Sequence, residues 1–344
     1  MDQKHYFNLS LFRIVATICV IQFHIVFVFA NKNPDLELML SKGVIGLTAL
    51  SGFLYGRKRI ENVKSFLGNR ILRILVPALF GLALMATWNL IYWIGNQNLN
   101  YGELWFGRRR YGGGLLFQAA NYYYIGYIIL CYLLVLLLNK RNKYLNIILL
   151  ISCLTGEGIL SYFYFFSFIV TAFIVGYLIG QKYFLKYVDP LEENINHTFI
   201  YFLLTTLFLA AFLILNYFPF EVTSELSNLV KLGQEISLDG FGIFFFFLFI
   251  NMTKSLNWSY FLNQITFIDK IAYPMFLLDL CFMVGAMNIG VIAPNYDLMN
   301  LVIYIFIIFF SIFIYFEYWF FNYNINYIKQ RKSQISFKSR ENCF

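Results

Sequence analysis

The fold is decided by the stretch from Leu9 to Ala30, which reads LSLFRIVATICVIQFHIVFVFA. Its 22 residues are almost all apolar, and a helix of that length is long enough to cross the hydrocarbon core of a bilayer. Two ionisable side chains, Arg13 and His24, interrupt it. They are eleven residues apart, which places them on one face of a helix and about 16 Å apart along its axis.

Two interpretations of this pair are open at this point. Ionisable side chains inside a membrane span are costly and usually functional, so a basic group near one surface and a deeper imidazole on the same face indicate one site. The structural alternative is an arginine that extends to the interface and a histidine hydrogen-bonded to a neighbouring helix. The segment alone does not separate these interpretations.

The composition extends the membrane interpretation to the whole chain. Of 344 residues, 60% are hydrophobic and 13% are charged, and the mean hydropathy is +0.65, whereas a soluble domain carries about 25% charged residues. We therefore predict an all-α, polytopic membrane bundle that forms a single domain over residues 1–344. The five cysteines show no metal-ligand or redox spacing, so we expect no metal.

Ten apolar segments are apparent, and we predict about ten transmembrane helices from them. The second, fifth and eighth are short for a bilayer. The segments cover about 9–30, 43–56, 74–95, 119–138, 145–157, 159–180, 198–218, 238–253, 269–293 and 298–322.

The distribution of Lys and Arg predicts the orientation. Three basic stretches fall on one side of a ten-span topology, which we assign to the cytoplasm, with both termini inside. They are 57–73, 140–143 and a basic tail over about 325–344. The net charge of +8 is explained by these loops, and no nucleic-acid partner is expected. Arg108, Arg109 and Arg110 fall outside in this topology, which indicates either a wrong span count or a basic outer site.

The chain between residues 43 and 77 carries two further patterns. Gly46, Ser51 and Gly52 are small residues that permit close contact between helices. Arg70 and Arg73 are neighbours on one helical face. Two guanidinium forks on one face suit a phosphate or pyrophosphate, although the same pair at a membrane flank also suits anionic lipid headgroups.

Taken in order, these patterns resemble the acyltransferase-3 family, whose members include O-antigen and capsule O-acetylases. The resemblance is carried by Arg13-x10-His24, by the segment 43–54 with its Leu-Ser-Gly-Phe-Leu sequence, and by Arg70-x-x-Arg73 before Pro77. It is strongest over residues 9–80. It implies transfer of an acyl group, usually acetyl, from cytoplasmic acyl-CoA to a hydroxyl of a cell-surface or lipid-linked glycan. It also implies a multi-pass protein of the bacterial cytoplasmic membrane.

The resemblance and the spacing together assign roles. We expect Arg13, Arg70 and Arg73 to bind acyl-CoA near the inner face, and His24 to act deeper in the membrane. An imidazole with a pKa near 6.5 suits a general base on the acceptor hydroxyl. It equally suits a covalent acyl carrier, and the sequence does not separate the two mechanisms.

The later segments match the family more loosely. The stretch 271–279 resembles the family's Ser-Tyr-x-x-Tyr-Leu-x-His pattern, with Ala272 in place of the serine and Asp279 in place of the histidine. We predict that Asp279 is a catalytic partner that orients the His24 ring. Glu317 resembles the family's glutamate in the last span, although Trp319 stands where a proline is usual. We place Glu317, with Ser51 and Gly52, in a supporting role, with Arg13 as the expected partner of Glu317.

Other functions remain to be separated from this one. A transporter or flippase for a lipid-linked saccharide would also be a bundle with few intramembrane charges, but no inverted repeat is apparent. A glycan polymerase or ligase would use no acyl donor. A non-catalytic acyltransferase-like protein is disfavoured by His24 and the intact arginine pair. Consumption of acyl-CoA by purified protein distinguishes the leading prediction.

Overall fold

In the computed structural model of the protein, the described residues are predominantly helical, and no strand occurs among them. This confirms the predicted all-α fold. The described residues are 3–29, 34–58, 60, 62–95, 123–138, 142–164, 167–181, 184–185, 189–191, 195–217, 224–253, 261–283, 301–316 and 319–320. Arg108 to Arg110 and the predicted basic tail lie outside this set.

The chain divides into two compact units. The first comprises Met1–Ile71 and Asn121–Ala272, and the second comprises Leu72–Ala120 and Tyr273–Phe344. Two helices, α4 (Val63–Gly95) and α13 (Leu262–Met283), begin in the first unit and continue into the second. In the second unit the Tyr273 hydroxyl donates a hydrogen bond to the Ile74 carbonyl at 3.1 Å. This unit also contains the apolar helix Leu301–Phe316.

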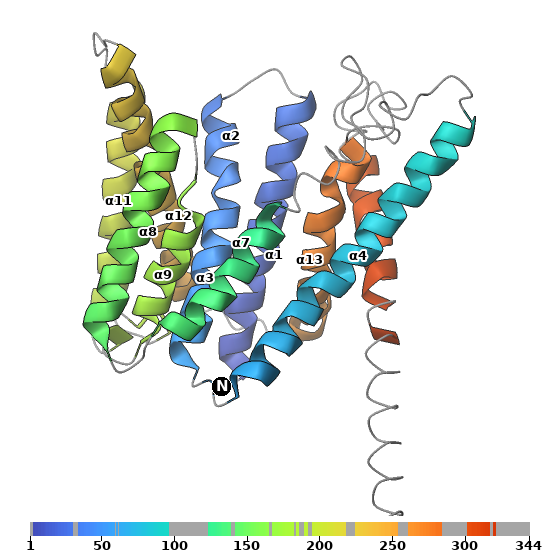
Figure 1. The fold of residues 1–344 in the computed structure, drawn as a ribbon, viewed down its shortest axis with the longest axis horizontal. Coiled ribbons are helices and arrows are strands. Elements are labelled where there is room, and N and C mark those ends of the chain that lie inside the picture. The colour runs from blue at the N-terminus through green and yellow to red at the C-terminus, as the bar shows by residue number, and fades with distance from the viewer. Residues whose placement is uncertain are drawn as a thin grey trace, which may run out of the picture. The chain divides into compact units, whose positions relative to one another are not determined.

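The first unit is built around α3 (Gly43–Arg57), which packs against α1 (Gln3–Phe29), α2 (Pro34–Ser41), α7 (Tyr123–Leu137), α9 (Ile169–Ile179) and α12 (Ser224–Thr253). Figure 1 shows α3 in the midst of this group. Helix α11 (Ile195–Tyr217) packs on α12, and α8 (Lys143–Tyr164) packs on α9 and α12. Because α8 and α11 carry rows of exposed apolar side chains, they suit contact with lipid.

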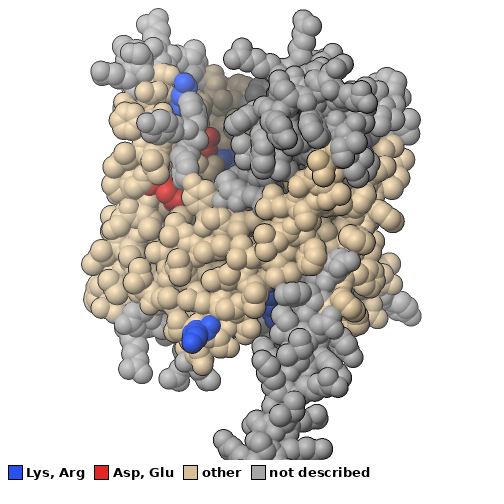
Figure 2. All heavy atoms as spheres, turned by 45° about the vertical axis from the view of Figure 1, so that its right-hand side comes forward, with Lys and Arg blue, Asp and Glu red and all other residues tan. Residues whose placement is uncertain are grey.

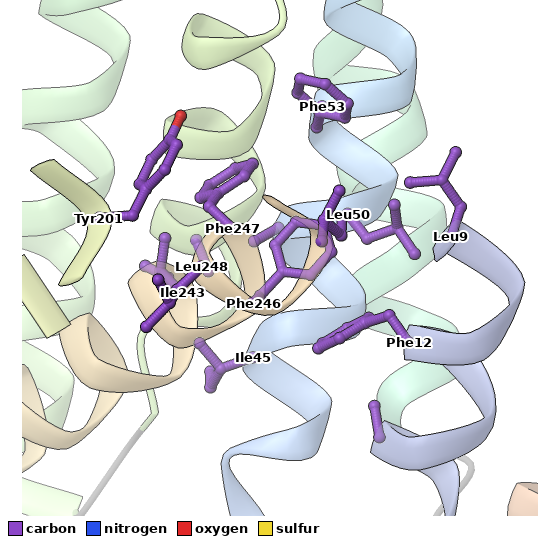
Figure 3. Close-up of a cluster of buried hydrophobic side chains, with 14 of the residues drawn as sticks. Leu9, Phe12, Ile45, Leu50, Phe53, Tyr201, Ile243, Phe246, Phe247 and Leu248 are labelled. Atoms are coloured by element: carbon purple, nitrogen blue, oxygen red, sulfur yellow. The ribbon is translucent and has the colours of Figure 1, made fainter. Parts of the chain in front are cut away.

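The core of this unit is aromatic and lies where α1, α3 and α12 meet. The Phe12 ring lies 4.3 Å from the Phe246 ring, and the Phe53 ring lies 5.7 Å from the Phe247 ring, between ring centroids. Figure 3 shows these rings converging from the three helices. Aromatic pairs at such distances add stabilisation beyond the apolar area that they bury.

The membrane character of the fold is confirmed, whereas the number of spans and the side of the termini stay predictions. Within the described residues, six helices are long and apolar enough to cross a membrane, and three shorter helices are also apolar. One of the six spans, Leu38–Arg57, joins α2 and α3 through Lys42. In the view of Figure 2 most of the described surface carries no charged side chain.

Two predicted boundaries are wrong. The predicted break near residue 158 is absent, because α8 continues to Tyr164 and the chain turns at residues 167–168. The stretch 224–237, expected to be a loop, is the first half of α12. Its Glu235, which lies outside the predicted spans, forms an ion pair with Lys42.

Candidate active site

The two residues that drew attention in the sequence lie on one uninterrupted helix. Helix α1 runs from Gln3 to Phe29 without a break, so Arg13 and His24 lie on one face about 16 Å apart along the axis. His24 is partly buried, and its ring centroid lies 5.0 Å from that of Phe23. The predicted spacing between a basic group and an imidazole is therefore present in the fold.

Arg13 is held by α13 and by its own helix. Its Nη2 lies 3.0 Å from Asp269 Oδ2 and donates to Ser10 Oγ at 3.5 Å, while its Nε donates to the Leu9 carbonyl at 3.4 Å. The Ser10 hydroxyl donates to the same Asp269 oxygen at 2.8 Å. Sequence reasoning missed Asp269, because it lies at the start of a predicted span where a carboxylate looks like a loop residue.

The level of Arg13 along α3 follows from the contacts of its neighbours on α1. The Phe12 ring lies against Gly46, and the Ala16 carbonyl lies against Gly43, so α1 and α3 run antiparallel. Arg13 is thus level with Gly46, which is eleven residues from Arg57, or about 16 Å along α3. The Arg13 side chain is 37% exposed, and its position relative to the inner face stays a prediction, because the cytoplasmic side of α3 is itself predicted.

The face of α1 between Arg13 and His24 is packed against protein. Thr17 is 3% exposed and Val20 is 1% exposed, and Val20 lies against Gly43 of α3. The face of α1 at Thr17 and Val20 is therefore covered by protein.

Arg70 has an aromatic environment. Its guanidinium carbon lies 5.3 Å from the centre of the Tyr55 ring, a distance at which a cation is attracted to the ring face. The Tyr55 ring in turn contacts Phe66 and Tyr132 at 5.2 and 5.3 Å between centroids. Arg73 follows one turn later on α4 and is exposed. The two arginines keep the predicted i, i+3 spacing because α4 already begins at Val63.

The small residues of α3 mediate helix packing. A Cβ atom on Gly52 would fall on the carbonyl oxygen of Phe173, and one on Gly56 would fall on that of Tyr177. The contact is reciprocal, because a Cβ on Gly176 would fall on the carbonyl of Ala49. Two glycine pairs four residues apart thus bring α3 and α9 into backbone contact. Ser51 donates to the Leu47 carbonyl of its own helix at 3.0 Å.

The remaining predicted residues are not tested. The backbone of Asp279 is part of α13, but its side chain is outside the described residues. Glu317 also lies outside them. The pairing of Asp279 with His24 therefore stays a prediction, and so does the pairing of Glu317 with Arg13. Among the residues that the structure describes, no cluster of three or more His, Cys, Asp or Glu side chains is arranged to hold a metal.

A buried charge cluster that sequence reasoning missed lies at the opposite end of α3 from Arg57. Lys42 Nζ is 2.7 Å from Asp239 Oδ1 and 2.9 Å from Glu235 Oε2. Asp239 Oδ2 accepts the Phe168 N–H at 2.7 Å. The sequence offered little signal for Asp239, because it is the second residue of the predicted span 238–253 and looks like a loop residue there, as Asp269 does at the start of its own span.

Glu157 of α8 completes the contacts at the start of α9. Its two carboxylate oxygens accept the backbone N–H groups of Val170 and Thr171 at 2.7 and 2.8 Å. The first N–H groups of a helix have no partner within the helix and carry a partial positive charge. Glu157 and Asp239 therefore satisfy and neutralise the N-terminus of α9 inside the bundle.

Lys42, Glu157 and Asp239 are thus charged side chains buried in a bundle of apolar helices, which is the arrangement of a multi-pass membrane protein. The acyltransferase-3 family model, described as an acyltransferase domain, matches residues 6–319. The chain belongs to this family, and membership supports an acyltransferase activity. No curated protein and no solved structure matches the chain.

Proposed function

We propose that the protein transfers an acyl group, most simply acetyl, from acyl-CoA to a hydroxyl of a cell-surface or lipid-linked glycan. In this reaction the thioester C–S bond breaks and an ester C–O bond forms. The hydroxyl proton passes to the thiolate of CoA, so no further reactant is needed. The protein would act in the bacterial cytoplasmic membrane, with the donor arriving from the cytoplasm.

The observation that carries the proposal is the placement of Arg13 and His24 on α1. The guanidinium of Arg13 is fixed by Asp269 and Ser10, and His24 lies about 16 Å further along the same helix face. A long, flexible donor can contact both residues at once. His24 then either removes the proton from the acceptor hydroxyl or carries the acyl group between donor and acceptor.

Arg70 supports the same proposal at the other end of the donor. It lies on α4 beside the Tyr55 ring, at the end of α3 that is predicted to face the cytoplasm. The guanidinium fork matches a phosphate, and Arg73 adds a second fork one turn away. The phosphates of CoA would bind here, where the donor enters.

The test uses purified protein in liposomes with radiolabelled acetyl-CoA and a lipid-linked saccharide extract from the source cells. We expect label in the saccharide and an equal amount of free CoA thiol. His24→Ala should lower transfer by about 10²–10⁴-fold, whereas Cys19→Ala on the same helix should leave it unchanged. Labelled protein trapped without saccharide would favour the covalent route.

Two results would contradict the proposal. If wild-type protein releases no thiol from acetyl-CoA in the presence of the saccharide extract, it is not an acyltransferase for this donor and acceptor. Movement of the saccharide across the liposome membrane without acyl transfer would then identify a flippase. If His24→Ala keeps more than half of the activity, the role of His24 is wrong.

A further inference from the structure

Arg13 is a charge-compensated arginine, and this restricts what it can bind. Its Nη2 lies 3.0 Å from Asp269 Oδ2, and the Asp269 side chain is 11% exposed. A carboxylate at this distance cancels much of the attraction that a guanidinium exerts on a second anion, and the effect is stronger in a partly buried site than in water. Arg13 is therefore poorly suited to hold a phosphate, in contrast to its expected role.

The contacts of Arg13 occupy only part of its guanidinium. They are made by Nε and Nη2, to Leu9, Ser10 and Asp269. Within the part of the chain that the structure describes, Nη1 makes no hydrogen bond. A guanidinium has five N–H donors in a fixed plane. Because the contacts of Nε and Nη2 fix this plane, the two N–H donors of Nη1 have a defined direction.

The position of Arg13 along the bundle is intermediate. Arg70 lies against Tyr55 of α3, whereas Arg13 is level with Gly46, nine residues and about 14 Å further along that helix. His24 lies about 16 Å beyond Arg13 along α1. A donor whose phosphates lie at Arg70 and whose thioester lies at His24 thus passes Arg13 with its middle, the pantetheine arm.

We propose that Arg13 binds a neutral amide carbonyl of the pantetheine arm through Nη1, and that Asp269 and Ser10 are the positioning residues that hold it for this task. The inference rests on the proposed function. Asp269 acts through Arg13 in two ways: it fixes the plane of the guanidinium, and it removes the net charge that would otherwise favour an anion. Arg13 thereby recognises the pantetheine arm, whereas Arg70 binds the phosphates.

The experiment compares two acetyl donors, acetyl-CoA and S-acetyl-pantetheine, which keeps both amides of the arm and lacks the phosphates. We expect Arg13→Gln to lower kcat/KM by a similar factor for both donors, about ten-fold for one lost hydrogen bond. Arg70→Gln is the matched control. It should lower kcat/KM for acetyl-CoA and leave that for S-acetyl-pantetheine unchanged, because the second donor carries no phosphate.

The role of Asp269 is tested by comparing Asp269→Asn in the wild-type protein and in the Arg13→Gln variant. Asp269→Asn keeps the size of the side chain and removes its charge. We expect it to raise the KM of both donors with a smaller change in kcat, and to add almost nothing in the Arg13→Gln background. A merely structural role would lower activity in both backgrounds alike. If Asp269→Asn does not fold, Ser10→Ala provides the same comparison, with a smaller effect in the same direction.

Three outcomes are decisive. If Arg13→Gln impairs only acetyl-CoA, Arg13 binds a phosphate and the inference is wrong. If the double variant loses kcat/KM by the product of the two single-variant factors, Asp269 does not act through Arg13. If wild-type protein uses neither donor, the proposed function itself fails, and this result is distinct from the other two.

Discussion

The two ends of α3 are both held by ion pairs, but in different surroundings. At one end Lys42 is 4% exposed and contacts Glu235 and Asp239, both largely buried. At the other end Arg57 Nη1 lies 3.0 Å from both oxygens of Asp189, and here the carboxylate is buried (8% exposed) whereas the Arg57 side chain is 28% exposed. The same chemistry therefore has different consequences. A buried charge that loses its partner has no water to replace it, whereas an exposed one is solvated again.

The largest effect is expected at the buried end. Lys42→Met leaves the carboxylates of Glu235 and Asp239 without their cation, and breaking a buried pair in this way costs about 3–5 kcal/mol. The free energy of unfolding, measured by denaturant titration in detergent micelles, should fall by this amount. Lys64→Met, at an exposed position on α4, is the control and should change little.

A second variant sharpens the interpretation of Lys42. Adding Glu235→Gln and Asp239→Asn to Lys42→Met removes the uncompensated charges while keeping side-chain size, so it should recover part of the lost stability. If Lys42→Met alone is as stable as the wild type, the buried end is not held by charge and the comparison between the ends fails.

An intermediate effect is expected between the two ends, where α3 touches α9. Gly176→Ala introduces a Cβ that collides with the Ala49 carbonyl, and overpacking of this kind costs about 1–3 kcal/mol. Gly156→Ala is the matched control, because a Cβ there meets no atom within 4 Å. It should be neutral or slightly stabilising, since alanine favours the helix. Equal stability of the two variants would contradict the tight contact.

The smallest effect is expected at the Arg57 end. Arg57→Gln should lower the free energy of unfolding by about 1 kcal/mol or less, because Arg57 is itself partly exposed and the Asp189 carboxylate keeps the N–H of Leu191 as a hydrogen-bond donor when the guanidinium is removed. A double-mutant cycle with Asp189→Asn isolates the coupling between the two side chains. A coupling as large as that of Lys42 with Asp239 would show that exposure does not distinguish the two ends.

Much of the fold could be predicted from the sequence because apolar length and pattern are local properties. The helix of Arg13 and His24 and the small residues of α3 follow from spacing alone. The partners do not, because nearly two hundred residues separate Lys42 from Asp239 and about 250 separate Arg13 from Asp269. Spacing within one helix carries no information about which distant helix lies beside it.

The boundaries that failed have a related cause. Glu157 is the last residue of the predicted span 145–157, and Glu235 lies three residues before the predicted span 238–253. Charged residues of this kind are typical of loops at membrane surfaces. In the structure Glu157 binds backbone N–H groups of α9 and Glu235 pairs with Lys42. Local sequence rules count a charge as a cost, and they cannot recognise that another helix supplies its partner.

The glycine contact between α3 and α9 has a consequence for motion. Where two helices meet through side chains, they can slide by exchanging rotamers, with little change in separation. Where carbonyl oxygens lie against glycine Cα atoms, no rotamer is available, and sliding requires the backbones to move apart. Helices α3 and α9 must therefore travel as one rigid body. Any rearrangement that opens the protein first to one side of the membrane and then to the other has to take place in the helices around this pair.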